Sequence, residues 1–284
     1  MATLSQCDFC KNAIPLSVER CPHCAQPGLF PNVRLANDPE ETTALEKRYQ
    51  TAIAAAATSN TSNNVRSFED ALQNSKAVIA KSVNEVLRLI TNTSQIFATY
   101  YQLIEAQVRL PEGSKWDSLR RVADSAIFKD QMQHIRFAAL SLDNRGLSNY
   151  GWCSMVLRSD LIAHRASLFE ENSVLFMKHH NVLMSEADKL PPGHKAVWQQ
   201  RAKLCVAKLA SKITTSTKPL SFPALLLKEG MTSEDDDFVE VHIWGPMTSR
   251  TIERVALASK MTKAERPIAK AIREKLNKIG VAVN

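Results

Sequence analysis

Cys7-Asp-Phe-Cys10 and Cys21-Pro-His-Cys24 determine how the N-terminal 30 residues of this chain fold. Each Cys-x-x-Cys pair can turn two thiolates toward a common centre, and two such pairs complete the tetrahedral four-thiolate shell that Zn²⁺ prefers. A segment of roughly 30 residues buries too little apolar surface to fold alone, so the metal would supply most of its folding free energy. We therefore predict a zinc ribbon over residues 1–30, with one structural Zn²⁺ bound by all four cysteines.

The length and composition of the whole chain limit the kinds of protein that it can be. With 284 residues, 44% of them hydrophobic, the chain can form one sizeable domain or two modest ones besides the ribbon. No apolar run approaches the roughly 20 residues of a membrane span, so no membrane partner is expected. No hydrophobic signal segment precedes the cysteines, which argues against a disulfide-stapled secreted module and favours a reducing cytoplasm. Cys153 and Cys205 are then expected to be packed thiols.

Positive charge is concentrated near the C-terminus. Residues 245–284 contain nine Lys or Arg and three Glu, whereas the rest of the chain is nearly neutral, within a total formal charge of +7. A basic segment beside a neutral body predicts contacts with phosphates, so nucleic acid is the expected partner, RNA rather than DNA. The predicted phosphate-binding residues are Lys263, Lys270, Arg273, Lys275 and Lys278. The alternative is a solvated helix face that aids solubility.

The region after the ribbon, residues 31–114, is predicted to be helical. A proline-bearing connector over 27–41 precedes a helix over 43–57 and a Ser/Thr/Asn-rich loop over 58–64. Apolar residues over 68–104 then recur at steps of three, four or seven, which predicts a long amphipathic segment, one bent helix or two. This stripe is expected to pack on its own domain; a partner helix from an inhibitor is the alternative.

Residues 115–284 are predicted to form a mixed α/β domain, which makes the whole chain α+β. Short apolar or alternating runs between turn residues predict a sheet. Helices are expected over 115–128, 194–213 and 263–279, and strands over 135–142, 152–157, 166–169, 174–177, 222–228 and 238–244, with 250–258 ambiguous. The last strand places Glu240 and His242 on one face, because side chains alternate along a strand. A carboxylate within an apolar strand is costly unless it is paired or functional.

Three blocks of this domain resemble the ADP-ribosyltransferase superfamily, in particular its bacterial toxin-like members. They are Asn149-Tyr-Gly-Trp-Cys-Ser-Met-Val-Leu-Arg158, Arg165-Ala-Ser-Leu-Phe-Glu-Glu-Asn-Ser173 and Val239-Glu-Val-His-Ile-Trp-Gly245. The resemblance covers roughly residues 130–260 and implies an ADP-ribosyltransferase-like domain with NAD as co-substrate. The position two before Glu240 is Phe238, where arginine-modifying members carry Glu or Gln, so protein arginine is not the expected acceptor.

The resemblance also implies a set of site residues. Arg136, Ser173 and Glu240 correspond to the catalytic positions on an early strand, a Ser-bearing strand and a late strand, and the Glu stabilises the oxocarbenium-like centre as nicotinamide leaves. The residues expected to contact NAD are His134, Arg136, Tyr150, Ser167, Ser173 and His242. The chain is accordingly interpreted as a toxin or phage-defence effector that modifies nucleic acid and is controlled by an antitoxin protein.

Two other classes of function remain open. One is a non-enzymatic zinc-ribbon module that binds nucleic acid or protein. The other is a metal-independent ribonuclease toxin that uses His134, His164 or His242 as acid and base. Each residue also has an ordinary structural explanation: Glu240 as a surface residue on an edge strand, His134 as a core histidine, and Ser173 as a loop serine.

Overall fold

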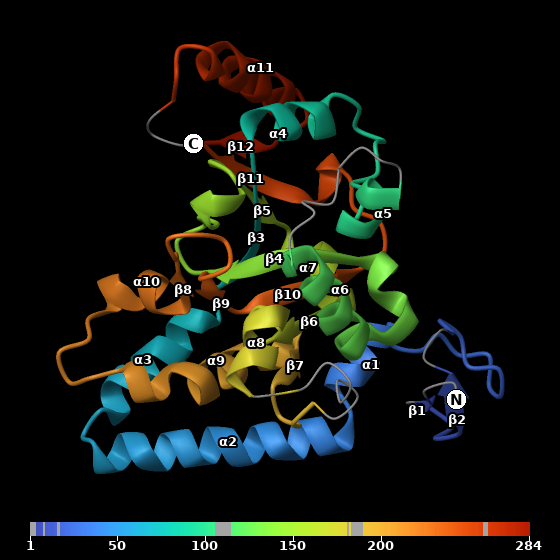
Figure 1. Cartoon of the computed structure of the whole chain (residues 1–284), viewed down its shortest axis with the longest axis vertical. Helices are drawn as coiled ribbons and strands as arrows, with labels where there is room; N and C mark the ends of the chain where they lie inside the picture. Colours follow the sequence, from blue (N-terminus) through green and yellow to red (C-terminus); the bar gives the residue numbers. More distant parts are fainter. Residues whose placement is uncertain are drawn as a thin grey trace.

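An eight-stranded sheet crosses the molecule (Figure 1). The structure is a computed structural model, and it describes residues 4–7, 9–15, 18–105, 115–180, 182, 190–257 and 261–284. Its strands lie in the order β12-β11-β5-β3-β4-β10-β6-β7, all antiparallel except the β11–β12 pair. The bounds are β3 (Lys76–Lys81), β4 (Ile135–Ser141), β5 (Cys153–Leu157), β6 (Ala166–Phe169), β7 (Lys195–Val197), β10 (Glu240–Trp244), β11 (Ile252–Ala256) and β12 (Ala282–Val283). The structure is therefore mixed α+β.

Helices cover both faces of this sheet, which is why β5 and β10 are buried along their whole length. In the lower half of Figure 1 lie α2 (Pro39–Thr58), α3 (Ser62–Leu72), α9 (Arg201–Leu209) and, at the left, α10 (Phe222–Leu226). At the upper edge lie α4 (Val83–Ile90), α5 (Tyr100–Glu105) and α11 (Glu265–Lys278). The remaining helices are α1 (Pro31–Ala36), α6 (Lys115–Phe128), α7 (Ser159–Ile162) and α8 (Ser173–His179).

Short elements complete the chain. The 3₁₀ helices are η1 (Lys129–His134), η2 (Ser148–Tyr150), η3 (Ala163–Arg165), η5 (Trp198–Gln200), η6 (Ala210–Lys212), η7 (Pro219–Ser221) and η8 (Ser249–Thr251). Two small hairpins add β1 (Leu4–Gln6) with β2 (Ala13–Pro15), and β8 (Leu227–Lys228) with β9 (Asp237–Phe238). In the described part of the chain, no helix combines the length and the apolarity that a membrane crossing requires.

The core is divided between the two faces of the sheet. The larger part joins α2, α3 and α9 to the sheet through side chains such as Leu45, Phe68 and Leu204. A smaller aromatic core, with Phe128, Phe169, Phe176 and Trp244 among its members, packs α6 and α8 on the other face. This second face carries Glu240 and His242, so the core around the candidate site is aromatic.

The prediction of a long amphipathic helical segment over residues 68–104 is wrong for part of that range. Residues 68–104 contain the end of α3, then β3, α4 and α5, and β3 lies in the centre of the sheet. The steps from Leu72 to Ile79 and Val83 fit a helix, but Ala77, Val78 and Ala80 are buried as well. Apolar residues on both faces of a short run are typical of a central strand. The region assigned to a helical middle therefore supplies a strand of the α+β domain.

Other boundaries differ for local reasons. The predicted strand over 174–177 lies in α8, because Asn172 caps that helix by accepting a hydrogen bond from the Val174 N–H. The predicted strand over 222–228 is mostly α10, which has Pro223 in its first turn. Residues 194–213 contain β7 before α9, the ambiguous 250–258 contains β11, and the connector contains α1. The helices over 115–128 and 263–279 are confirmed, whereas residues 111–113, Ala258 and Lys260 lie outside the described residues.

Candidate functional site

A cleft of about 940 Å³ opens where β3 and β4 diverge. The two strands pair only from Lys76 to Val78, opposite Ser141 to Ala139. Beyond Val78, β3 pairs only with β5, while residues 135–138 of β4 pair only with β10. The diverging segments, 79–81 and 136–138, both line the cleft, together with residues of α4 and the chain over 95–100. The split in the sheet therefore positions the cleft.

Glu240 lies at the wall of this cleft, at the start of β10. Glu240 is only 1% exposed. One carboxylate oxygen, Oε2, lies 3.1 Å from Nε2 of His242, and the other, Oε1, lies 3.3 Å from a guanidinium nitrogen of Arg120. Since β10 lies between β4 and β6, Glu240 is not a surface residue on an edge strand. Glu240 and His242 do share one face of the strand, as the alternation predicts.

Arg120 links two buried carboxylates across the cleft wall. Its Nε lies 3.4 Å from Asp124, which also accepts hydrogen bonds from the Tyr101 hydroxyl at 2.6 Å and the Ser173 hydroxyl at 2.8 Å. The guanidinium lies over the ring of Phe137, 4.6 Å from its centroid. Ser173 and Glu240 are thus joined through Asp124 and Arg120, although they come from α8 and β10.

The environments of the two carboxylates push their pKa values apart. Burial opposes ionisation of Glu240, but the hydrogen bond with His242 and the charge of Arg120 outweigh it, so the pKa of Glu240 is lowered. Burial raises the pKa of Asp124 in spite of Arg120, and the charge of Glu240 adds to the rise. Burial and the nearby Asp124 also raise the pKa of Tyr101. Of the two carboxyl groups, Glu240 is therefore the one whose charged form its neighbours favour.

Replacing Arg120 with Leu is expected to destabilise the fold by about 3 kcal/mol at neutral pH, because it leaves two carboxylates buried without their shared cation. In the wild type, the lowered pKa of Glu240 contributes stability above the ordinary carboxyl pKa, and that stability is lost on acidification. In the variant both carboxyl pKa values would be raised, so the penalty shrinks as the groups take up protons. Urea unfolding at neutral pH and at about pH 5 measures this change. The matched control is Arg121→Leu at the neighbouring, exposed position; equal losses in both variants would contradict the role of Arg120.

The other predicted NAD-contacting residues lie in different surroundings. Arg136 lines the cleft, but its guanidinium donates to the backbone carbonyls of Phe97 at 2.7 Å and Gly245 at 2.6 Å. Burial and the nearby Arg165 lower the pKa of Arg136 to about 10. Since Arg136 pairs with Ile243 in the β4–β10 register, it belongs to the sheet face opposite Glu240. Arg136 therefore fastens the backbone at Phe97 and at Gly245 to the start of β4.

Three further predicted residues are distributed around β10. His134 is exposed, and its ring packs on Trp244 with centroids 4.9 Å apart. Ser167 is buried and accepts a hydrogen bond from Asn32 of α1 at 3.1 Å. Tyr150 lines the cleft, where burial raises the pKa of its phenol to about 12 while Arg120 acts in the opposite sense. Of the predicted residues, the structure brings Glu240 together with His242, Ser173 and Tyr150 around Arg120.

The sequence prediction missed Arg120, Asp124 and Tyr101. A signal for the first two exists in the helix over 115–128. Arg120 and Asp124 are four residues apart and share a helix face with the buried Ala123 and Ile127. A charged pair on the apolar face of a helix indicates a buried partner of opposite charge. The chain does not reveal from its sequence that this partner is Glu240, 120 positions away.

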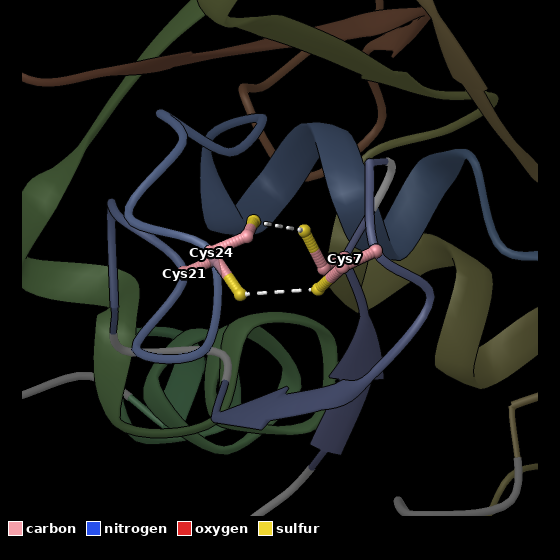
Figure 2. Close-up of side chains that lie close together, drawn as sticks. Cys7, Cys21 and Cys24 are labelled. Atoms are coloured by element: carbon pink, nitrogen blue, oxygen red, sulfur yellow. Dashed lines mark hydrogen bonds between the residues drawn. The ribbon is translucent and has the colours of Figure 1, made fainter.

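A second site lies in the N-terminal ribbon. Figure 2 shows Cys7 facing Cys21 and Cys24, with the sulfur atoms turned toward each other. The Cys7–Cys24 and Cys10–Cys21 sulfur atoms lie 3.7 Å and 3.5 Å apart, and all four ligand atoms lie within 4.8 Å of one another. Four sulfurs at about 2.3 Å from a tetrahedral Zn²⁺ are about 3.8 Å apart, so the donor set fits. The cluster can bind one metal ion.

The two halves of the ribbon have the same local geometry. The residue after each second cysteine, Lys11 or Ala25, has a φ of 61° or 57° and donates its N–H to the carbonyl of Cys7 or Cys21. Each turn thus folds back on its own cysteine pair. Arg34 of α1 attaches the ribbon to the sheet domain by donating to the carbonyls of Val18 at 2.9 Å and Leu29 at 2.8 Å.

The predicted phosphate-binding residues lie on or beside α11. Ala269, Ile272 and Leu276 are buried, which directs the opposite face of this helix to solvent. Four of the predicted residues, Lys263, Lys270, Arg273 and Lys278, are exposed, and Lys275 is half-buried. The buried stripe packs on α4, whose residues Asn84, Glu85, Arg88 and Leu89 line the cleft. In Figure 1, α11 lies beside α4, and since α4 lines the cleft, the basic face of α11 is separated from the cleft by this one helix.

No protein-family model matches this chain, and no curated protein does. Its function must therefore be inferred from its own residues.

Proposed function

We propose that this protein is an NAD-dependent ADP-ribosyltransferase whose active site is the cleft between β3 and β4. The observation that carries this proposal is Glu240, a buried carboxyl group at the cleft wall whose two oxygens contact Arg120 and His242, and whose pKa these neighbours lower. Cofactor pockets have volumes of about 300–1,000 Å³, and the cleft of about 940 Å³ lies within that range. Tyr100, Tyr150 and Phe238 among the cleft residues offer aromatic rings for the nicotinamide or adenine.

The reaction would use Glu240 as a fixed negative charge. The bond between ribose C1′ and the nicotinamide nitrogen breaks, its electron pair leaves with nicotinamide, and the acceptor atom bonds to C1′ and releases its proton to solvent. Positive charge develops on the ribose as the first bond breaks, and a preorganised carboxylate stabilises it. Arg120 now covers one oxygen of Glu240. We propose that the pyrophosphate of NAD attracts Arg120 and frees this oxygen for the ribose.

Nucleic acid, RNA rather than DNA, is the proposed acceptor. Tyr150 is 37% exposed and lies in the cleft beside the buried ring of Phe238, with ring centroids 6.5 Å apart. Unpaired bases stack on such rings, whereas an arginine substrate would need a polar group there. The basic face of α11 would hold the phosphates without reading the sequence. Because such an enzyme would damage its own host, we also propose a toxin or phage-defence role under the control of an antitoxin.

Charge reversal on α11 tests the acceptor. The triple variant Lys270→Glu, Arg273→Glu, Lys278→Glu is expected to weaken modification of all RNA substrates alike and to lower the salt dependence of binding by about 1 in log–log slope per lost phosphate contact. Filter binding and labelled-NAD assays over a series of salt concentrations measure both effects. The matched control reverses three exposed lysines outside α11, Lys47, Lys218 and Lys228. If both triple variants behave alike, α11 is not the phosphate-binding face.

Incubation of the full chain with ³²P-labelled NAD and a cell extract tests the proposed activity itself. We expect free nicotinamide and label that is removed by ribonuclease. Label that survives nuclease and stays on protein bands would keep the transferase and reject the nucleic-acid acceptor. Absence of both label transfer and NAD turnover would reject the transferase; RNA shortened without NAD would then favour a ribonuclease, and RNA binding alone a zinc-ribbon binding module.

A further inference from the structure

A second cluster of metal-binding side chains lies outside the cleft and the ribbon. Glu170 follows β6, His180 is the C-cap of α8, and His194 precedes β7. One ligand atom from each lies within 4.8 Å of the others. Glu170 and His194 are 6% and 7% exposed, whereas His180 is open to solvent. Three elements of the fold thus deliver two imidazoles and one carboxylate to one point at the surface.

The buried ligand atoms at this point have close charged neighbours but no aligned hydrogen bond among the described residues. Nδ1 of His194 lies 2.8 Å from Oε1 of Glu170, but neither this nitrogen nor Oε2 of Glu170 makes a hydrogen bond of acceptable geometry with the described residues. Two ligand atoms bound at about 2.0–2.1 Å to one tetrahedral Zn²⁺ are roughly 3.3 Å apart, so a small movement would seat an ion between them.

We infer that Glu170, His180 and His194 form a binding site for a divalent transition-metal ion, and we identify the ion as Zn²⁺. Two imidazoles and a carboxylate suit Zn²⁺, and the exposure of His180 leaves a fourth position for water. The His180 ring is oriented by stacking on Phe176, with centroids 4.1 Å apart. Arg48 lies 2.7 Å from Oε2 of Glu170, whereas His194 contacts the other oxygen, Oε1. Arg48 thus helps to orient the carboxylate.

Zinc counting on the full chain tests this site. After loading with Zn²⁺ and removal of free metal, we expect two equivalents per chain, one in the ribbon and one here, and a loss of one equivalent in His194→Gln and in His180→Gln. The matched controls are His179→Gln, whose ring contacts Glu171 at 2.8 Å, and His23→Gln in the ribbon. Both controls should keep two equivalents.

Co²⁺ titration of the unaltered chain makes the test independent of whether the variants fold. The first equivalent should give the intense charge-transfer band of a thiolate site. The second should add only the weaker ligand-field bands of nitrogen and oxygen ligands. If the unaltered chain binds a single equivalent, or if the second equivalent also gives thiolate bands, the site does not exist as proposed.

Discussion

Replacing Glu240 with Gln is expected to lower the rate of nicotinamide release from NAD by about 10²–10³-fold, the effect of removing one preorganised electrostatic group from an active site. Gln keeps the shape of the side chain, and its carbonyl oxygen can still accept from Arg120, whereas an amide group replaces the oxygen that faces His242. The negative charge is lost with little change in shape. The measurement is kcat for nicotinamide release with the fold checked by circular dichroism.

The control for this variant is Glu253→Gln. Glu253 is also carried by a strand and also forms an ion pair, at 2.7 Å from Lys76, but it is not among the described residues that line the cleft. Its replacement should leave the rate within a few-fold of the wild type. A Glu240→Gln protein that is folded and as active as the Glu253→Gln protein would remove Glu240 from the mechanism.

Replacing Cys21 with Ser is expected to release one equivalent of zinc and to unfold the ribbon. Structural Zn²⁺ contributes an apparent 10–16 kcal/mol, roughly, to the folding of small zinc domains. The ribbon has no comparable alternative, because its described apolar core consists of Ile14 and the cysteines with Val18 packed against them. Hydrogen exchange should show loss of protection over 4–28, while the sheet keeps its protection, since its strands pair only with one another.

Cys205→Ser is the matched control for the ribbon variant. Cys205 is a fully buried thiol of α9 in the large core. Its replacement can cost stability but should leave the ribbon zinc in place. A Cys21→Ser protein that retains all its zinc, or one whose sheet unfolds together with the ribbon, would contradict the independence of the two parts.

Features that depend only on residues close together in the sequence were predicted correctly. The four cysteines converge because their spacing is local, and β4, β5, β6 and α6 follow from runs of apolar residues with a clear period. β3 was missed because a run such as Ala77-Val78-Ile79-Ala80 is compatible with either period when it is buried on both sides. Its assignment to a sheet is decided by pairing with β4 and β5, whose residues are more than 50 positions away.

The candidate site was predictable only in part for the same reason. Glu240 and His242 were found from strand alternation within one segment. Arg120, Asp124 and Tyr101 come from helices, and only the packing of α5 and α6 against the sheet brings them to Glu240. The NAD-binding role predicted for Arg136 stays a prediction; its guanidinium donates to the carbonyls of Phe97 and Gly245.

The position of β10 in the sheet has a consequence during synthesis on the ribosome. β4 and β6 do not pair with each other; β10 lies between them and pairs with both. A nascent chain that has not yet reached residue 240 can pair β3 with β4 and β5, and β6 with β7, but it can neither join these two parts of the sheet nor place a carboxylate at the cleft. The joining of these two parts through β10 and the arrival of Glu240 are a single event late in translation. Under the proposed toxin function, chains that lack β10 would be harmless, and the proposed antitoxin would need to capture only chains that contain it.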